Sequence, residues 1–323
     1  MATQYDVIFM GTPEFAARVL HHVLHRPGTR ILCVLTQPDR PKGRGRKPAP
    51  SAVKVLAREE KLDVWQPGTL STPEAQDYLL SLSPDFLLVA AYGLLLPSSV
   101  LSLPRHAALN VHASLLPKFR GAAPIQRAIA NGEHVTGISI MRMQAGLDCG
   151  PILMQRALAI GMEDTAQDVH DQLAELGGQC LVQTLDLWQS QELLEIPQDE
   201  AQASYAPKLH KSEGSIQWDR NARDVHNHIR AMTPWPGART ELTLPGQSKP
   251  LQVILLPGNI GEARPQDMAP GDFLTSQSGE HIGFACADRL YWVHTLKPAS
   301  RAPMPASAFI CGYLSKAQTK GPC

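Results

Sequence analysis

Apolar and polar positions follow two different periods along the first part of the chain. Short apolar runs that predict buried strands lie at residues 6–10, 31–36, 85–91 and 107–112, with a shorter run near Val64. Helical spacing separates them at residues 51–60 and after Thr72, and Thr12 is expected to cap a helix that opens at Pro13. Strands alternating with helices predict an α/β fold with a Rossmann-like, mostly parallel sheet.

The period changes again after residue 135. Residues 136–143 alternate like a sheet strand, residues 152–160 could pair with them, and residues 165–188 repeat apolar side chains at helical spacing. The polar stretch 190–207 is predicted to be a linker. We therefore expect one domain over residues 1–189 and a second over residues 208–323.

The second domain is predicted to be mostly β. One helix is expected at residues 222–232, and short strands are expected at residues 239–244, 251–256, 281–287 and 290–296. Short strands separated by glycine and proline turns are typical of a small β-barrel.

Length, cysteine content and charge narrow the class of protein. The 323 residues exceed the usual size of one core, and 43% of them are hydrophobic. Six cysteines without paired spacing predict reduced thiols in the cytoplasm, and no apolar run approaches the ~20 residues of a membrane span. Residues 208–323 carry 13 basic and 9 acidic side chains, which ordinary scatter explains as well as nucleic-acid contact does.

The clearest chemical signal is an Asn-x-His at the end of the strand predicted at 107–112. Asn110 and His112 are two residues apart, so an extended strand places both side chains on one face. Ligands of open α/β sheets bind at that carboxyl edge. Histidine exchanges protons near neutral pH and an asparagine amide can stabilise an oxyanion, so the pair suits acyl-like group transfer. Taken alone, such a pair is more often structural.

A carboxylate follows in the glycine-rich turn Gly146-Leu147-Asp148-Cys149-Gly150. An aspartate in such a turn is usually a turn residue. Near a histidine, the carboxylate of Asp148 could orient the imidazole and favour its charged form.

A basic loop separates the second predicted strand from the helix at 51–60. It contains Arg40, Lys42, Arg44, Arg46 and Lys47 and exceeds the ~2–6 residues usual for such connections. A solvated surface loop is the plainer interpretation out of context. The loop lacks the Gly-Lys-Ser/Thr ending of a Walker loop, and no Gly-x-Gly-x-x-Gly follows the first strand.

Histidines and tryptophans give two weaker signals. Residues 21–25 include three histidines, but no His-Glu-x-x-His pattern or further ligand accompanies them, so no metal site is expected. Trp218, Trp235 and Trp292 could stack on bases but are predicted to be core anchors of the second domain.

Taken together, these motifs resemble those of the folate-dependent formyltransferases. Members of that family share Asn-x-His, Ser-Leu-Leu-Pro and Gly-Leu-Asp-x-Gly, which begin here at Asn110, Ser114 and Gly146. The resemblance covers nearly the whole chain, and it implies the formyltransferase fold with an OB-like C-terminal barrel. Ala113 and Cys149 depart from the family pattern, where glycine or proline and threonine are frequent.

The resemblance also implies roles for particular residues. The catalytic set corresponds to Asn110, His112 and Asp148. The residues that contact the co-substrate, 10-formyltetrahydrofolate, correspond to Ser114, Leu115, Leu116, Pro117, Ala91, Tyr92 and Gly93. In the chemistry expected, Asn110 and His112 donate to the tetrahedral oxyanion, His112 passes a proton to the leaving N10, and Asp148 orients His112 and accepts a proton.

Within the family, the chain resembles the members that formylate initiator methionyl-tRNA. In those members the insertion that matches the basic loop enters the acceptor-stem region, and the C-terminal module binds the RNA backbone. The candidate tRNA contacts are Arg40, Lys42, Arg44, Arg46, Lys47, Lys208 and Lys211, with Arg220 and Arg223 in the second domain. A cytoplasmic monomer that binds no membrane is expected.

Three alternatives share parts of this pattern. A formyltransferase acting on a nucleotide amino sugar should have the same three catalytic residues but lack the basic loop and the basic C-terminal barrel. A formyl-folate hydrolase would use water in place of the amine. An RNA-binding protein with an inert transferase fold would not need Asn110, His112 and Asp148.

Overall fold

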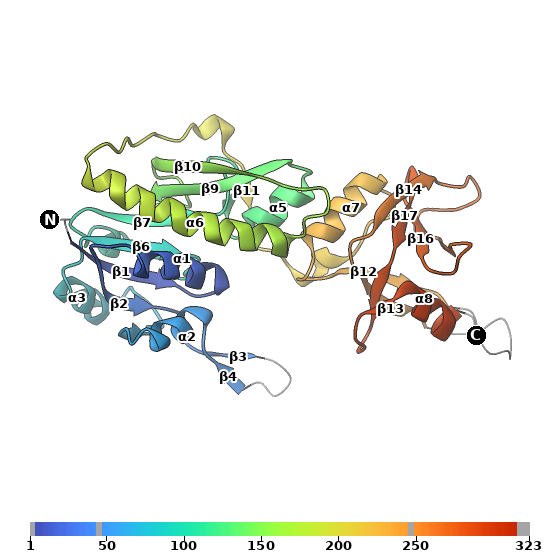
Figure 1. The fold of residues 1–323 in the computed structure, drawn as a ribbon, viewed down its shortest axis with the longest axis horizontal. Coiled ribbons are helices and arrows are strands. Elements are labelled where there is room, and N and C mark those ends of the chain that lie inside the picture. The colour runs from blue at the N-terminus through green and yellow to red at the C-terminus, as the bar shows by residue number, and fades with distance from the viewer. Residues whose placement is uncertain (1–3, 43–46, 245–248, 315–323) are drawn as a thin grey trace. The chain divides into compact units, whose positions relative to one another are not determined.

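A seven-stranded sheet organises the first part of the chain in the computed structural model, which describes residues 4–42, 47–244 and 249–314 (Figure 1). The strands, in the order they take across the sheet, are β10 (Ile152–Ala159), β9 (Val135–Arg142), β7 (Ala107–His112), β6 (Phe86–Ala90), β1 (Tyr5–Gly11), β2 (Thr29–Leu35) and β5 (Val64–Trp65). The five strands from β7 to β5 are parallel, whereas β9 is antiparallel to both β7 and β10. The Rossmann-like, mostly parallel sheet is thus confirmed.

Helices cover both faces of this sheet. On one face lie α1 (Glu14–Leu24) and the long α6 (Ala166–Gln189), where the rings of Phe15 and His170 meet at 5.7 Å. The other face packs against α3 (Pro73–Ser81) and α4 (Ser98–Leu101) through a core that includes Leu79, Val100 and Ala108. Helix α2 (Ala52–Glu59) packs beside α1.

Helix starts follow the capping residues in two of three cases. Ser51 caps α2 by accepting from the Lys54 N–H at 3.0 Å, and Thr72 caps α3 in the same manner. The expected cap at Thr12 is wrong. Helix α1 begins at Glu14 behind Pro13, and the Thr12 hydroxyl donates instead to the carbonyl of Tyr92 at 2.9 Å.

The chain folds into two units. The first holds Met1–Pro124, Val135–Ala159 and His170–Ala206, and the second holds Ile125–His134, Ile160–Val169 and Pro207–Cys323. Most of the stretch expected to be a linker thus belongs to the first unit. Within it, β11 (Tyr205–Ala206) pairs in parallel with β8 (Arg120–Gly121), and Ile196 forms a bridge with Ile152.

The second unit contains α7 (Ala222–Ala231) and two four-stranded antiparallel sheets. One sheet runs β12 (Ala238–Leu242), β13 (Leu251–Leu255), β18 (Thr295–Pro298), β19 (Met304–Pro305), and the other runs β14 (Asn259–Ala263), β17 (Arg289–Val293), β16 (Ile282–Ala285), β15 (Phe273–Thr275). Among the described residues, no hydrogen-bonded pairing closes these sheets into a single barrel. Strands are present at the four ranges that were expected, β14, β15 and β19 were not expected, and the closed barrel is not seen.

Several short elements were not expected from the sequence. They include α5 (Pro124–Ala130), α8 (Ala306–Phe309), the 3-10 turns at Glu200–Gln202 and Lys211–Gly214, and a π-helical turn at Ile310–Leu314. In the described part of the chain, no helix is long and apolar enough to cross a membrane.

The three tryptophans of the second unit differ in environment. Trp218 is buried and stacks on Phe284 with ring centroids 4.8 Å apart, as a core anchor should. Trp292 is half-buried, and its indole N–H donates to Glu262 at 3.0 Å. Trp235 is 55% exposed, so its expected role as a core anchor is wrong.

Candidate active site

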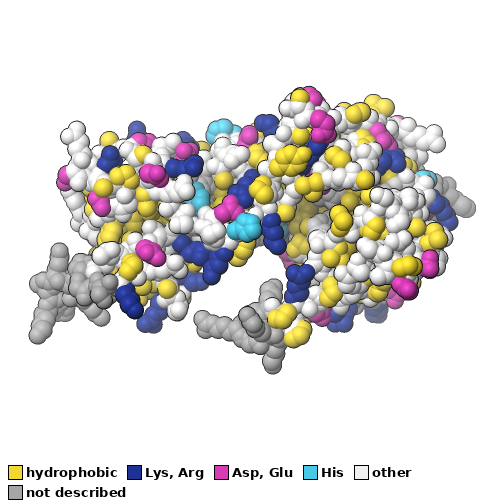
Figure 2. Space-filling view, turned by 180° about the vertical axis from the view of Figure 1, so that it is seen from behind, with side chains coloured by type: hydrophobic (Ala, Val, Ile, Leu, Met, Phe, Trp, Pro, Cys, Tyr) yellow, Lys and Arg dark blue, Asp and Glu magenta, His cyan; other side chains and the backbone are white. Residues whose placement is uncertain are grey.

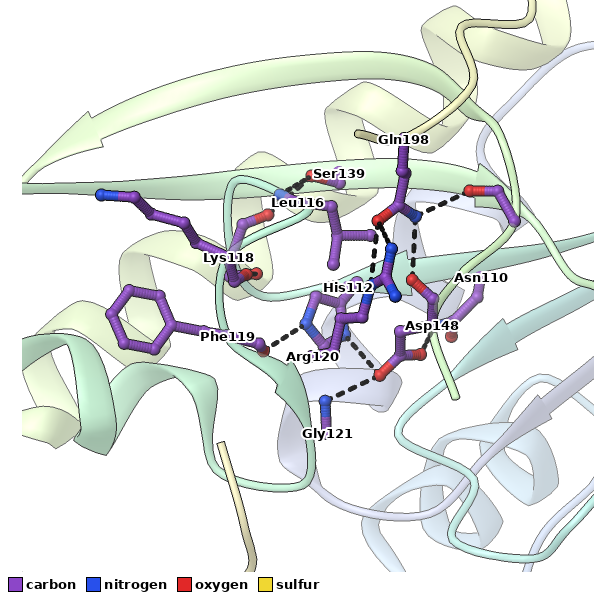
Figure 3. A network of polar contacts seen from close by, with 12 residues as sticks. Asn110, His112, Leu116, Lys118, Phe119, Arg120, Gly121, Ser139, Asp148 and Gln198 are labelled. Carbon is purple, nitrogen blue, oxygen red and sulfur yellow. Dashed lines mark hydrogen bonds and ion pairs between the residues drawn. The ribbon is translucent and has the colours of Figure 1, made fainter. Parts of the chain in front are cut away.

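Three polar side chains converge at the carboxyl edge of the parallel strands (Figure 3). Asn110 and His112 come from the end of β7, on the strand face that also carries Ala108, and Asp148 comes from the loop between β9 and β10. Asp148 Oδ2 lies 3.6 Å from Nδ1 of His112. Asp148 Oδ1 lies 3.5 Å from the amide nitrogen of Asn110, the outer limit of a hydrogen bond.

The His112 ring is held by a backbone carbonyl. Its Nε2 atom lies 3.0 Å from the oxygen of Phe119, and the residue is only 5% exposed. Because a carbonyl oxygen only accepts, Nε2 must carry a hydrogen in the neutral ring. Nδ1 is then the nitrogen that accepts or releases a proton, and it is the one that faces Asp148.

The Asp148 carboxylate is fixed by a second backbone group. Its Oδ2 atom accepts a hydrogen bond from the N–H of Gly121 at 2.9 Å. Gly121 has φ +117, and a Cβ there would lie 2.8 Å from the carbonyl oxygen of Ala206. Only glycine fits this close approach in that conformation. Phe119 and Gly121 follow closely after Pro117, but sequence patterns do not reveal backbone partners.

A buried arginine network supports the Asp148 loop from the other side. Arg120 donates to Oε1 of Gln198 through Nε and Nη2, at 3.1 and 2.8 Å, and pairs with Glu200 at 2.8 Å. The hydrogen bond from Arg120 lowers the pKa of Glu200, and the carboxylate raises the pKa of Arg120. The amide of Gln198 donates to the carbonyls of Asp148 and Gly150 at 2.8 and 2.7 Å. Sequence reasoning missed these residues because Gln198 and Glu200 lie in the polar stretch interpreted as a linker.

The loop from Ser114 to Pro117 is tied to the sheet. Ser114 is fully buried, and its hydroxyl donates to the carbonyl of Lys118 at 2.6 Å. Leu116 is buried as well, whereas Leu115 and Pro117 are half-buried. The Ser139 hydroxyl accepts from the Leu116 N–H at 3.0 Å and donates to the Ser114 carbonyl at 2.7 Å. Ser114 and Leu116 therefore hold the loop in shape, and Leu115 and Pro117 present its surface.

The neighbouring segment Ala91-Tyr92-Gly93 follows β6 at the same sheet edge. The Tyr92 side chain is buried, which raises the pKa of its hydroxyl, and its carbonyl accepts from the Gln37 amide at 3.0 Å. Ala91 and Gly93 are exposed. Gly93 has φ +79, a left-handed conformation that favours glycine, and a Cβ there would also lie 2.4 Å from Nε2 of Gln37.

The basic loop forms a short hairpin. Strands β3 (Arg40–Lys42) and β4 (Lys47–Ala49) pair antiparallel, and Arg40 is exposed. The candidate contacts Arg44 and Arg46 lie outside the described residues. At the base of the hairpin, buried Lys54 donates to Asp39 at 2.7 Å, which lowers the pKa of that carboxyl.

The other basic candidates lie in the second unit. Lys208, Lys211, Arg220 and Arg223 are all exposed. Figure 2 shows Lys and Arg side chains gathered on the face of this unit that the view presents. Among the described residues, no group of three or more His, Cys, Asp or Glu side chains is arranged to hold a metal ion.

Comparisons with known proteins place these features in a family. The family described as formyl transferase matches residues 5–185, and the formyl transferase C-terminal domain matches residues 208–314. The chain therefore belongs to the formyltransferase family.

Relatives and solved structures agree with this class. The chain is 49% identical to a protein of Nitratidesulfovibrio vulgaris Hildenborough named methionyl-tRNA formyltransferase, over 98% of this chain and 95% of the relative. A Geobacter sulfurreducens protein with the same name is 42% identical over 95% of this chain and 93% of its own length. The fold also resembles an N-formyltransferase from Helicobacter canadensis solved with folinic acid and dTDP-3-aminofucose, at TM-score 0.64 and 17% identity, over 92% of this chain and all of that one.

Proposed function

We propose that this chain transfers the formyl group of 10-formyltetrahydrofolate to the α-amino group of initiator methionyl-tRNA. The observation that carries the proposal is the position of Asp148 within 3.6 Å of both Asn110 and His112. That arrangement lies in a chain 49% identical to a relative named methionyl-tRNA formyltransferase. The tRNA acceptor in turn implies action in the cytoplasm, and a site built from one chain fits a monomer.

Proton movement is assigned to Nδ1 of His112. Since Nε2–H is directed at the Phe119 carbonyl at 3.0 Å, a protonated ring can offer only Nδ1–H to a substrate. When the amine attacks the formyl carbon, Nδ1–H and the Asn110 amide donate to the developing oxyanion. As the bond between the formyl carbon and N10 breaks, Nδ1 gives its proton to N10.

Asp148 closes the proton cycle. Its carboxylate accepts the proton that the attacking amine loses, directly or through water. It then returns that proton to Nδ1 of His112, 3.6 Å away, which restores the starting state. The same carboxylate stabilises the charged imidazole while the oxyanion exists. No enzyme nucleophile is required, so neither Ser114 nor Cys149 takes part covalently.

The loops at the sheet edge fit a folate. Half-buried Leu115 and Pro117 offer apolar surface, and the exposed backbone of Ala91 and Gly93 offers hydrogen-bonding groups. A flat heterocycle with polar edges needs both kinds of contact. Ser114, Leu116 and Tyr92 contribute by shaping these loops from within.

The tRNA is assigned to the basic hairpin and the second unit. Arg40, Lys42, Arg44, Arg46, Lys47, Lys208 and Lys211 are the proposed contacts. Arginines and lysines suit phosphate contact, which positions the acceptor end without reading its sequence. Such contacts make binding steeply dependent on salt.

One assay tests the proposed function against its alternatives. Labelled 10-formyltetrahydrofolate is incubated with the enzyme and charged initiator tRNA, with a nucleotide amino sugar, or with neither. The label should enter the methionyl-tRNA alone. Label in the sugar would identify a sugar formyltransferase, and formate released without an acceptor would identify a hydrolase.

A further inference from the structure

The chain from residue 196 to residue 206, here called the return segment, runs back across the proposed active site. Its Ile196 exchanges two backbone hydrogen bonds with Ile152, at 2.8 and 2.9 Å. Its Ser204 accepts from the Phe119 N–H at 2.9 Å and from the Arg120 N–H at 2.8 Å. The return segment therefore contacts both loops that hold the catalytic partners.

We propose that Gln198 and Arg120 are positioning residues that set the carboxylate of Asp148 against His112. Gln198 donates one amide to two carbonyls, those of Asp148 and Gly150, and so fixes the backbone on both sides of Cys149 (Figure 3). The inference rests on the proposed catalytic role of Asp148.

The backbone at Asp148 needs such a support. Its φ is +50, in the left-handed region that residues other than glycine, asparagine and aspartate seldom occupy. In this conformation, the side chain points back to His112 and Gly121, while the carbonyl points to Gln198. Without the Gln198 amide, the Asp148 carbonyl loses the partner that holds the turn in this conformation.

Arg120 fixes Gln198 in turn. Its guanidinium is 2% exposed and donates twice to Oε1 of Gln198, which leaves the amide nitrogen directed at the two carbonyls. Glu200 binds the remaining edge of the guanidinium through both carboxylate oxygens at 2.8 Å. Arg120 is also the residue between Phe119 and Gly121, whose backbone groups hold His112 and Asp148. Arg120 is thus connected to the site twice, through its side chain to Gln198 and through its two neighbours to His112 and Asp148.

The test replaces the Gln198 amide without changing its length. Gln198→Met should lower kcat about 10- to 100-fold, because displacements near 1 Å are costly in catalysis. KM for folate and for tRNA should stay within about twofold. The matched control is Gln202→Met, an exposed residue of the same segment whose side-chain amide donates to Asp199. This control should keep the wild-type rate.

Measuring the effect of Gln198→Met in the Asp148→Asn variant separates a positioning role from a merely structural one. If Gln198 acts through Asp148, adding Gln198→Met to the Asp148→Asn variant should lower kcat almost no further. Wild-type kcat in Gln198→Met, or its full effect in the Asp148→Asn background, would overturn the inference. Should Gln198→Met fail to fold, Gln198→Glu replaces it, because the glutamate can still accept from Arg120 but cannot donate to the carbonyls of Asp148 and Gly150. The same two results for kcat would then overturn the inference. A near-normal rate in Asp148→Asn alone would instead refute the proposed function.

Discussion

The side-chain amide of Gln155 donates a 2.8 Å hydrogen bond to the carbonyl oxygen of Leu116. This bond ties strand β10 to the loop from Ser114 to Pro117, which we propose contacts folate. The same amide nitrogen also reaches the Ser139 hydroxyl at 2.8 Å. The side chains of Gln155 and Ser139 thus hold the backbone of this loop against the sheet.

Replacement of Gln155 should therefore weaken folate binding more than it slows the chemistry. A neutral hydrogen bond contributes about 1 kcal/mol, so Gln155→Leu should raise KM for the formyl donor about fivefold, with kcat within about threefold. Steady-state kinetics with varied donor check this. The control is Gln179→Leu, an exposed position on α6. An unchanged donor KM in Gln155→Leu would contradict the proposed place of the folate.

Substitution of the three proposed catalytic residues should cause a much larger loss of turnover. Removal of an oxyanion donor costs about 3–4 kcal/mol in the barrier, so Asn110→Ala and His112→Ala should each slow turnover at least about 100-fold. Asp148→Asn should do the same, since an amide cannot accept the proton. Single-turnover rates with saturating substrates measure this directly. Cys149→Ala is the local control and should retain activity, because no covalent step is proposed.

The residues that we propose as catalytic could be singled out from the sequence, but their geometry could not. The strand expected at 107–112 appears with those bounds, and its period of two puts Asn110 and His112 on one face. Which nitrogen of His112 is free depends on the Phe119 carbonyl, a backbone group that any residue would supply. In the proposed mechanism, Asp148 therefore shares the orienting of the ring with Phe119, whose carbonyl binds the other ring nitrogen.

The polar stretch 190–207 shows a different limit of prediction from the sequence. Its composition favours a linker, because no apolar period marks a strand or helix. Gln198 and Ser204 nevertheless pair with groups 48 to 85 residues away along the chain. Such contacts depend on the path that residues 190–207 take over the first unit, and packing outside the segment determines that path. The same reason explains the error at Thr12, whose hydroxyl binds Tyr92, 80 residues on.

The proposed tRNA surface makes a prediction about salt. Lys208→Gln combined with Lys211→Gln should raise KM for tRNA and leave the folate KM unchanged, because both side chains are exposed and remote in sequence from the folate loops. The slope of log affinity against log salt should fall by about one for each phosphate that is no longer bound. Lys61→Gln, an exposed lysine of the first unit, is the control. An unaltered salt slope in the double variant would exclude a role for these two lysines in tRNA binding.

The basic hairpin can be tested separately from the second unit. Arg40 is exposed at its base, and Lys54 paired with Asp39 anchors the chain just before it. Arg40→Glu should raise the tRNA KM several-fold through repulsion of phosphate, with the donor KM unchanged. Filter binding of charged tRNA, with and without a folate analogue, measures the effect. Equal tRNA affinity in Arg40→Glu and wild type would remove the hairpin base from the interface.

A buried histidine of the second unit should make stability depend on pH. His226 is 2% exposed, its Nε2 lies 2.8 Å from the Met162 carbonyl, and its Nδ1 lies 3.0 Å from the Tyr291 hydroxyl. Burial lowers the pKa of His226 below its ordinary value of 6.5 in the folded state. At a pH between the pKa of His226 in the folded state and its pKa in the unfolded state, the unfolded chain carries a proton on His226 and the folded chain does not.

The sign of this linkage is fixed by that difference in bound protons. The free energy of unfolding should fall as the pH drops below about 6.5, by at most about 1.4 kcal/mol per pH unit from this group. Above that pH both states hold a neutral ring, so the contribution vanishes. Melting curves of wild type and His226→Gln between pH 5 and pH 8 measure the effect. The slope should be smaller in His226→Gln, and equal slopes would mean that His226 takes up its proton as readily when folded as when unfolded.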